Sequence, residues 1–277
     1  MDRRRQVALL MFAALIGTPA TTIAQAQVDQ HALAQQVLGT NLTEQSHAVE
    51  QARALGPQRT GPELRAALIA VLERNNRLVI QAAQRDEAVE SFVNPEFVAQ
   101  VAHVVSQLGD PMAIPALAGA LGTGSTLVQD ALADFGERAA PEVLRVVTDP
   151  ASLDEAVNDG LITLRFMVEG NETRPLSAAT VSAIRRAVKQ RLTGKQYFTT
   201  VWRAIDLAVV LKDADLRRIV ESLAANRDSV AARGIDDPEF IQLTQKRAAG
   251  GLAGARPMPR YRTSAERARQ LEPRSPR

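Results

Sequence analysis

Apolar positions recur every three or four residues along most of the chain, which is the spacing of one face of an α-helix. The clearest stripe runs from Pro62 to Arg85, and a second runs from Pro95 to Leu108. Each begins with a proline in the first turn, where the missing N–H costs nothing, and Gly109 stops the second. The pattern therefore predicts helices in both segments.

The same reasoning predicts a row of shorter helices in the rest of the chain. One ends at Leu121, one is capped by Ser125 and runs to Ala133, and one begins at Pro141. Further helices are expected at about 152–168, 177–193, 196–211, 214–225 and 237–249. Because no run of four or more residues alternates convincingly as a strand, the predicted fold class is all-α.

Two segments in the middle of this row echo each other. The proline helix around Pro115 returns at an offset of 26 around Pro141, and the closing glycine Gly109 returns at an offset of 27 as Gly136. A unit of two short helices cannot bury its apolar face alone. We therefore expect successive units to stack on one another.

Residues 108–147 (LGDPMAIPALAGALGTGSTLVQDALADFGERAAPEVLRVV) resemble the short HEAT-like repeats first noted in phycobilisome lyases and since seen in many scaffold proteins. The matching pattern is an aspartate, Ala-Ile-Pro-Ala-Leu, a loop, and an Ala-rich second helix that ends in Leu/Phe-Gly. The usual Val-Arg of that helix is replaced here by Leu127-Val128-Gln129. The resemblance implies a right-handed stack of helical hairpins, an α-solenoid, which binds proteins on a helical surface. It assigns lyase chemistry to no residue of the motif.

The first 26 residues carry a different pattern. Three arginines at positions 3 to 5 precede the apolar run from Val7 to Ile16, and Ala24-Gln25-Ala26 precedes Gln27. This is the pattern of a Sec-type signal peptide cleaved after Ala26. The alternative is a retained signal anchor, although ten apolar residues are about half of what a membrane-spanning helix needs. We therefore expect a periplasmic or secreted protein, for which nucleic acid is not a routine partner, and no transmembrane insertion after signal cleavage.

Composition divides the remaining chain into a helical repeat domain, residues 27–249, and a tail, residues 250–277. The tail holds seven arginines, two glutamates and four prolines, a net charge of +5, so we expect it to be disordered when free. The body carries the balancing acidic charge. The tail is either a solubilising extension or a contact for a partner, and its candidate interaction residues are Arg256, Arg260, Arg262, Arg267 and Arg269.

A second basic cluster lies in and just after the helix predicted at 177–193. Its members are Arg185, Arg186, Lys189, Arg191 and Lys195. They form either a solvated helix face or a peripheral contact with an anionic envelope component, such as lipid headgroups or an acidic protein surface. Nearby, Phe198 and Trp202 lie one helical turn apart, and we expect them to pack inward.

Catalytic and metal-binding patterns are sparse. The chain has no cysteine, which excludes disulfides and thiolate metal sites, and His31, His47 and His103 show no metal-ligand spacing, so no metal or cofactor is expected. His31 and His47 could meet between adjacent N-terminal helices. The segment from Glu90 to Pro95 resembles the Glu-Ser-x-x-Asn-Pro segment of lysozyme-like lytic transglycosylases, which would make Glu90 the general acid and base for peptidoglycan cleavage.

The combined features indicate a non-enzymatic, exported helical scaffold or adaptor that binds another protein of the bacterial cell envelope. The alternatives are the peptidoglycan-cleaving enzyme just described and a carrier of a hydrophobic ligand, which requires a large apolar cavity between helices.

Overall fold

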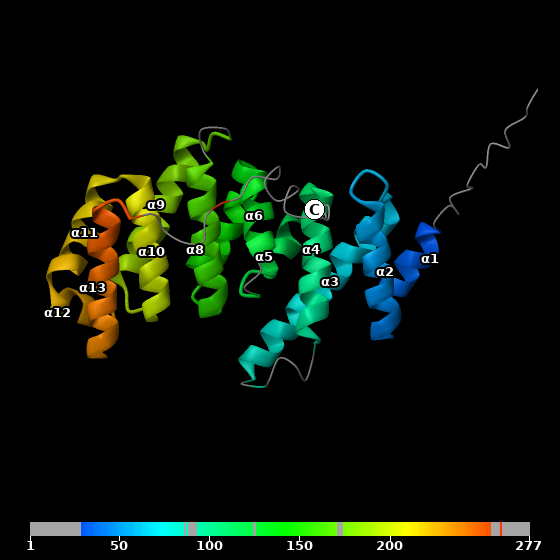
Figure 1. Cartoon of the computed structure of the whole chain (residues 1–277), viewed down its shortest axis with the longest axis horizontal. Helices are drawn as coiled ribbons and strands as arrows, with labels where there is room; N and C mark the ends of the chain where they lie inside the picture. The colour runs from blue at the N-terminus through cyan, green and yellow to red at the C-terminus, as the bar shows by residue number, and fades with distance from the viewer. Residues whose placement is uncertain are drawn as a thin grey trace, which may run out of the picture.

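A computed structural model describes residues 29–85, 87, 93–123, 126–170, 174–255 and 261 of the chain (Figure 1). Within these residues the regular structure is entirely helical, with no strand, which confirms the all-α class. The α-helices are α1 (Gln30–Leu38), α2 (Leu42–Leu55), α3 (Pro62–Gln84), α4 (Pro95–Leu108), α5 (Ile114–Gly119), α6 (Thr126–Phe135), α7 (Ala140–Thr148), α8 (Asp154–Glu169), α9 (Ala178–Thr193), α10 (Phe198–Leu211), α11 (Ala214–Ala225), α12 (Arg227–Ala231) and α13 (Pro238–Leu252). Two single 3-10 turns, η2 (Pro111–Ala113) and η3 (Gly136–Arg138), precede α5 and α7.

Short polar side chains fix where many of these helices begin. Asn94 accepts a hydrogen bond from the backbone N–H of Phe97 at 3.0 Å, and Ser177 accepts one from Thr180 at 3.1 Å. Such caps satisfy backbone donors that have no partner within the helix. The helix starts observed at Pro95 and Ala178 are therefore set by local chemistry.

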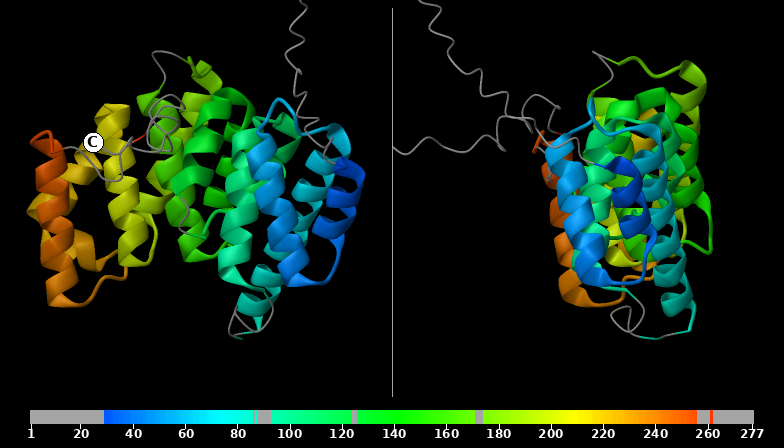
Figure 2. Two further views of the ribbon diagram at one scale, coloured as in Figure 1. Left: turned by 45° about the vertical axis from the view of Figure 1, so that its right-hand side comes forward. Right: turned by 90° about the vertical axis from the view of Figure 1, so that its right-hand side faces the viewer.

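The helices pair in a regular way. Each odd-numbered helix from α1 to α9 packs against the even-numbered helix that follows it, and α11 packs against α13. From α1 to α11 each helix also contacts the helix two places away, and α10 contacts α13. One layer consists of α1, α3, α5, α7, α9 and α11, and the other of α2, α4, α6, α8, α10 and α13. Figures 1 and 2 show the helices side by side in chain order, with α1 at one end and the α11–α13 group at the other. The assignment to a right-handed HEAT-like solenoid stays a prediction.

The two echoing sequence segments take equivalent places in this arrangement. Pro115 and Pro141 both lie in the first turn of their helices, and these helices, α5 and α7, are neighbours in one layer. Gly109 and Gly136 follow α4 and α6 with positive φ angles of 62° and 54°, which a side chain would strain. The glycines therefore end equivalent helices of the other layer.

One apolar core runs the length of the described chain, from Leu33 on α1 to Ala248 on α13. Close approach of helices depends on small residues: a Cβ on Gly160 of α8 would lie only 2.6 Å from Val147 of α7. None of the helices in the described residues has both the length and the apolar character needed to cross a membrane.

Several features differ from the sequence-based expectation. The short helix α12 was not predicted, and α13 continues to Leu252 rather than ending at residue 249. In addition, Tyr261, from the segment expected to be disordered, is half-buried and packs against the core. At least one residue beyond the predicted boundary at 249 and 250 is therefore packed against the helical body.

Candidate functional site

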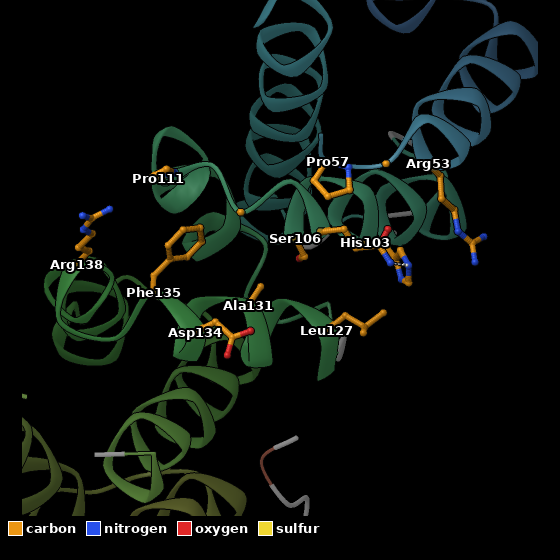
Figure 3. Close-up of a pocket in the computed structure, with 13 residues that line it drawn as sticks. Arg53, Pro57, His103, Ser106, Pro111, Leu127, Ala131, Asp134, Phe135 and Arg138 are labelled. Atoms are coloured by element: carbon orange, nitrogen blue, oxygen red, sulfur yellow. Dashed lines mark hydrogen bonds between the residues drawn. The ribbon is translucent and has the colours of Figure 1, made fainter. Parts of the chain in front are cut away.

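On the described part of the molecule, a groove of about 760 Å³ follows α4 between α2 and α6. We call it the α4 groove. Leu127, Ala131 and Phe135, at helical spacing on α6, form its apolar wall, and His103 and Ser106 face them from α4 (Figure 3). The groove thus combines an apolar wall with a polar one.

Charged side chains stand at the ends of the α4 groove. Arg53, at the end of α2, and Arg138, on η3, lie at opposite ends in Figure 3, and both are exposed. A segment bound along the groove would therefore meet a guanidinium at each end. This arrangement suits apolar side chains flanked by carboxylates.

The polar wall of the groove is neutral. Burial, reinforced by the positive charge of Arg53, lowers the pKa of His103 below the ordinary histidine value. The Gln107 side-chain amide nitrogen lies 2.9 Å from His103 Nε2, so the uncharged imidazole accepts this hydrogen bond. Ser106 also lines this wall, with its Oγ buried and without a hydrogen-bond partner among the described residues.

Asp134 closes the groove towards α8 and belongs to a second cluster. Its Oδ1 accepts a hydrogen bond of 2.8 Å from Arg174 Nη1 and one of 2.5 Å from the hydroxyl of Tyr261. The Arg174 guanidinium also hydrogen-bonds that hydroxyl and lies over the Tyr261 ring, with its central carbon 5.2 Å from the ring centroid. The other ring contact is Phe166, at 5.7 Å between centroids. We call Asp134, Arg174 and Phe166 the tyrosine site.

The environment of Tyr261 favours the neutral phenol. Burial and the hydrogen bond to the Asp134 carboxylate raise the pKa of Tyr261 to about 12, against the opposing effect of Arg174. The tyrosine is therefore held as a hydrogen-bond donor at all physiological pH values.

A third cluster lies between α8, α10 and α13, where three arginines surround Asp206. Arg247 donates to both Asp206 oxygens, at 2.9 and 2.6 Å, and Arg165 and Arg203 each place a nitrogen 3.8 Å from Oδ2. Burial lowers the pKa of Arg165 and of Arg203, and the Asp206 carboxylate opposes this effect in both cases. Since its carboxylate is engaged by three guanidiniums, we assign this cluster to the stability of the fold.

The aromatic residues of α10 reinforce the same region. Trp202 donates its indole N–H to Thr244 Oγ1 at 2.7 Å, and Phe198 stacks on Phe240 with 4.1 Å between ring centroids. The side chains of Phe198 and Trp202 are at least half-buried, so the expectation that they pack inward is confirmed. Tyr197, by contrast, is 54% exposed.

The predicted basic cluster does not behave as one set. Arg185, Arg186, Lys189 and Lys195 are exposed, and Arg185 pairs with Asp213 at 3.4 Å. The guanidinium of Arg191 instead binds the backbone carbonyl of Val147 at 2.8 Å and Gln196 at 2.9 Å. Arg191 therefore caps a backbone carbonyl at the C-terminal end of α7. Binding of a partner by the other four residues stays a prediction.

Several predicted residues lie outside the described part of the chain. They are residues 1–26 of the signal pattern, Ser125, Glu90, and the tail arginines Arg256, Arg260, Arg262, Arg267 and Arg269. Neither export nor peptidoglycan cleavage is tested by the structure.

His31 and His47, which the sequence suggested could meet, each contact a different residue instead. His31 Nδ1 lies 2.7 Å from Glu63 Oε1, and His47 contacts Gln51 of its own helix. In the part of the chain that the structure describes, no group of three histidine or carboxylate side chains is placed to hold a metal ion.

Sequence reasoning missed the α4 groove and the tyrosine site. One signal was present, because Tyr261 is the sole aromatic residue of the tail. Its partners could not be identified, since Arg174 lies 87 positions and Asp134 127 positions earlier in the chain.

Comparison of the chain with protein-family models, with curated proteins and with solved structures found no match.

Proposed function

We propose that the chain is an exported helical-repeat scaffold of the bacterial cell envelope that binds a segment of another protein in the α4 groove. Export rests on the signal pattern of residues 1–26, and protein binding rests on the groove. The observation that carries the proposal is an apolar wall on α6 facing neutral polar groups on α4.

The groove favours an extended or helical peptide segment as the ligand. Leu127, Ala131 and Phe135 present a strip of one helix face, to which a few apolar side chains can dock. Arg53 and Arg138 at the two ends favour acidic residues flanking the apolar ones. The expected partner segment is therefore apolar in its centre and acidic at its ends.

Site-specific photo-crosslinking tests this proposal in cells. A photoreactive amino acid at Gln107, which is exposed and lines the groove, should form an adduct with an envelope protein. The same amino acid at Leu243, a 39% exposed position on α13, serves as the control and should form no such adduct. Equal adducts at both positions, or none at Gln107, would contradict the proposal.

A matched pair of substitutions adds specificity to this test. Leu127→Glu places a carboxylate in the apolar wall and should reduce the Gln107 adduct at least tenfold, since burying an unpaired charge is costly. Leu243→Glu changes a leucine outside the groove in the same way and should leave the adduct unchanged. Export is tested separately, by fractionation of chains with and without residues 1–26.

A further inference from the structure

The contacts of Tyr261 with the helical body join more distant parts of the array than the main helix contacts described above. The main helix contacts join elements one or two places apart in the chain, and α10 also contacts α13. Tyr261 lies beyond α13 but contacts Asp134 on α6, Phe166 on α8 and Arg174, which follows α8. A side chain from the end of the array thus reaches back across its middle.

The tyrosine site is assembled by the body itself. Phe166 belongs to the apolar core that runs through the helical body. Asp134 and Arg174 form an ion pair of 2.8 Å, and the backbone N–H of Arg174 binds the carbonyl of Gly170 at 3.1 Å. A site built from such supported side chains is pre-organised for its occupant.

The chemistry of the site matches a tyrosine on both of its features. The Asp134 carboxylate accepts a hydrogen bond from the hydroxyl, while Phe166 and the Arg174 guanidinium contact the ring. Phenylalanine would lose the first interaction, and a short polar side chain would lose the second. All of these interactions are made by one side chain, as they are for anchor residues at protein interfaces.

We propose that Asp134, Arg174 and Phe166 form a receptor site for a tyrosine side chain, and that Tyr261 of the same chain occupies it reversibly as a tethered ligand. The C-terminal segment is then a ligand of the helical body. Because Asp134 also lines the α4 groove, the tethered ligand docks at the edge of the surface proposed to bind the envelope partner. The test below needs no envelope partner, so it can fail or succeed independently of that proposal.

Peptide binding to the full chain tests the proposal. The probe is a fluorescent peptide with the sequence of residues 255–267, which contains Tyr261, and binding is followed by fluorescence anisotropy. In the wild-type chain the tethered tyrosine competes at an effective concentration on the order of millimolar. The variant Tyr261→Ala vacates the site, so it should bind the peptide at least tenfold more tightly than wild type.

Control peptides separate recognition of tyrosine from attraction of positive charge. A peptide with phenylalanine in place of the tyrosine should bind the vacated chain about tenfold or more weakly, because a hydrogen bond to a carboxylate is lost. A peptide with alanine in place of the tyrosine, which keeps the positive charge, should not bind measurably. Adding Asp134→Ala to the Tyr261→Ala chain should reduce binding of the original peptide to the level of the phenylalanine peptide or below.

Three results would overturn the proposal. The first is equal binding of the peptide by wild type and Tyr261→Ala, and the second is equal binding of the original peptide and the peptide with alanine in place of tyrosine. The third is a wild-type dimer that Tyr261→Ala converts to a monomer in analytical ultracentrifugation, because the occupant would then come from a second copy. Circular dichroism checks the fold of each variant, and Tyr261→Phe, which keeps the ring, replaces Tyr261→Ala if the latter does not fold.

Discussion

Removing the charge of Asp206 should be among the most damaging single changes in the chain. The carboxylate is 7% exposed and holds three guanidiniums, two of them at 3.8 Å and that of Arg247 through two hydrogen bonds. At such distances and an effective dielectric of about 20, each ion pair is worth roughly 4 kcal/mol before desolvation is subtracted. In Asp206→Asn three guanidiniums remain close together with their shared counter-charge gone.

We expect Asp206→Asn to lower the free energy of unfolding by about 3–5 kcal/mol, the range observed when one partner of a buried ion pair is removed. Urea unfolding measures this loss by two signals. Circular dichroism at 222 nm follows the whole helical chain, and fluorescence of Trp202, the one tryptophan of the sequence, follows the cluster itself. Both transitions should move to lower urea.

A matched control separates the buried cluster from ordinary surface charge. Glu221 pairs with Arg217 on the exposed surface of α11 at 2.8 Å, and Glu221→Gln should cost less than about 1 kcal/mol. Adding Arg247→Met to Asp206→Asn should recover part of the loss, since it removes one uncompensated charge. If Asp206→Asn costs no more than Glu221→Gln, the carboxylate does not organise the cluster and the reasoning is refuted.

Three further predictions concern other parts of the chain. Gly160→Ala should destabilise the protein by about 1–3 kcal/mol through a clash with Val147, whereas Gly250→Ala, with its nearest contact at 3.7 Å, should be neutral or stabilising in thermal unfolding. Lys212 ends α10 with a φ of 51°, so Lys212→Gly should raise stability by up to about 1 kcal/mol; an unchanged melting temperature would argue against strain there. Docking of Tyr261 should persist below pH 10 and be lost as the pH rises through about 12, because the pKa of Tyr261 is raised in the folded chain. Ultraviolet titration measures this pKa in a variant whose other tyrosine is replaced by phenylalanine. A titration midpoint near pH 10 would contradict the prediction.

Much of the local structure could be predicted from the sequence. The helix expected at 214–225 was observed with the same bounds, and those expected at 177–193 and 196–211 each differ only at the start. Apolar periodicity, capping side chains and helix-starting prolines act over a few neighbouring residues, so one sequence is enough to detect them. The five-residue helix α12 was missed because it is too short to show a period.

The candidate sites were predicted less well, and Arg191 shows why. The sequence grouped it with Arg185 and Arg186 by charge and proximity. On the helix, however, Arg191 lies two turns from the buried Ile184 and on the same side, which directs it at α7 and the Val147 carbonyl. The helical period could have distinguished Arg191 from its exposed neighbours. It could not have identified the Val147 carbonyl as the partner of Arg191.

The sequence by itself determined the helical character of this protein, the ends of most helices and the uneven distribution of charge. The tertiary structure decided which helices stack, that three arginines share Asp206, that α2, α4 and α6 enclose a groove, and that Tyr261 meets Asp134 and Arg174. The reason is the range of the forces involved. A helix is set by contacts within about four residues, whereas a site depends on packing between segments whose separation along the chain leaves no periodic trace.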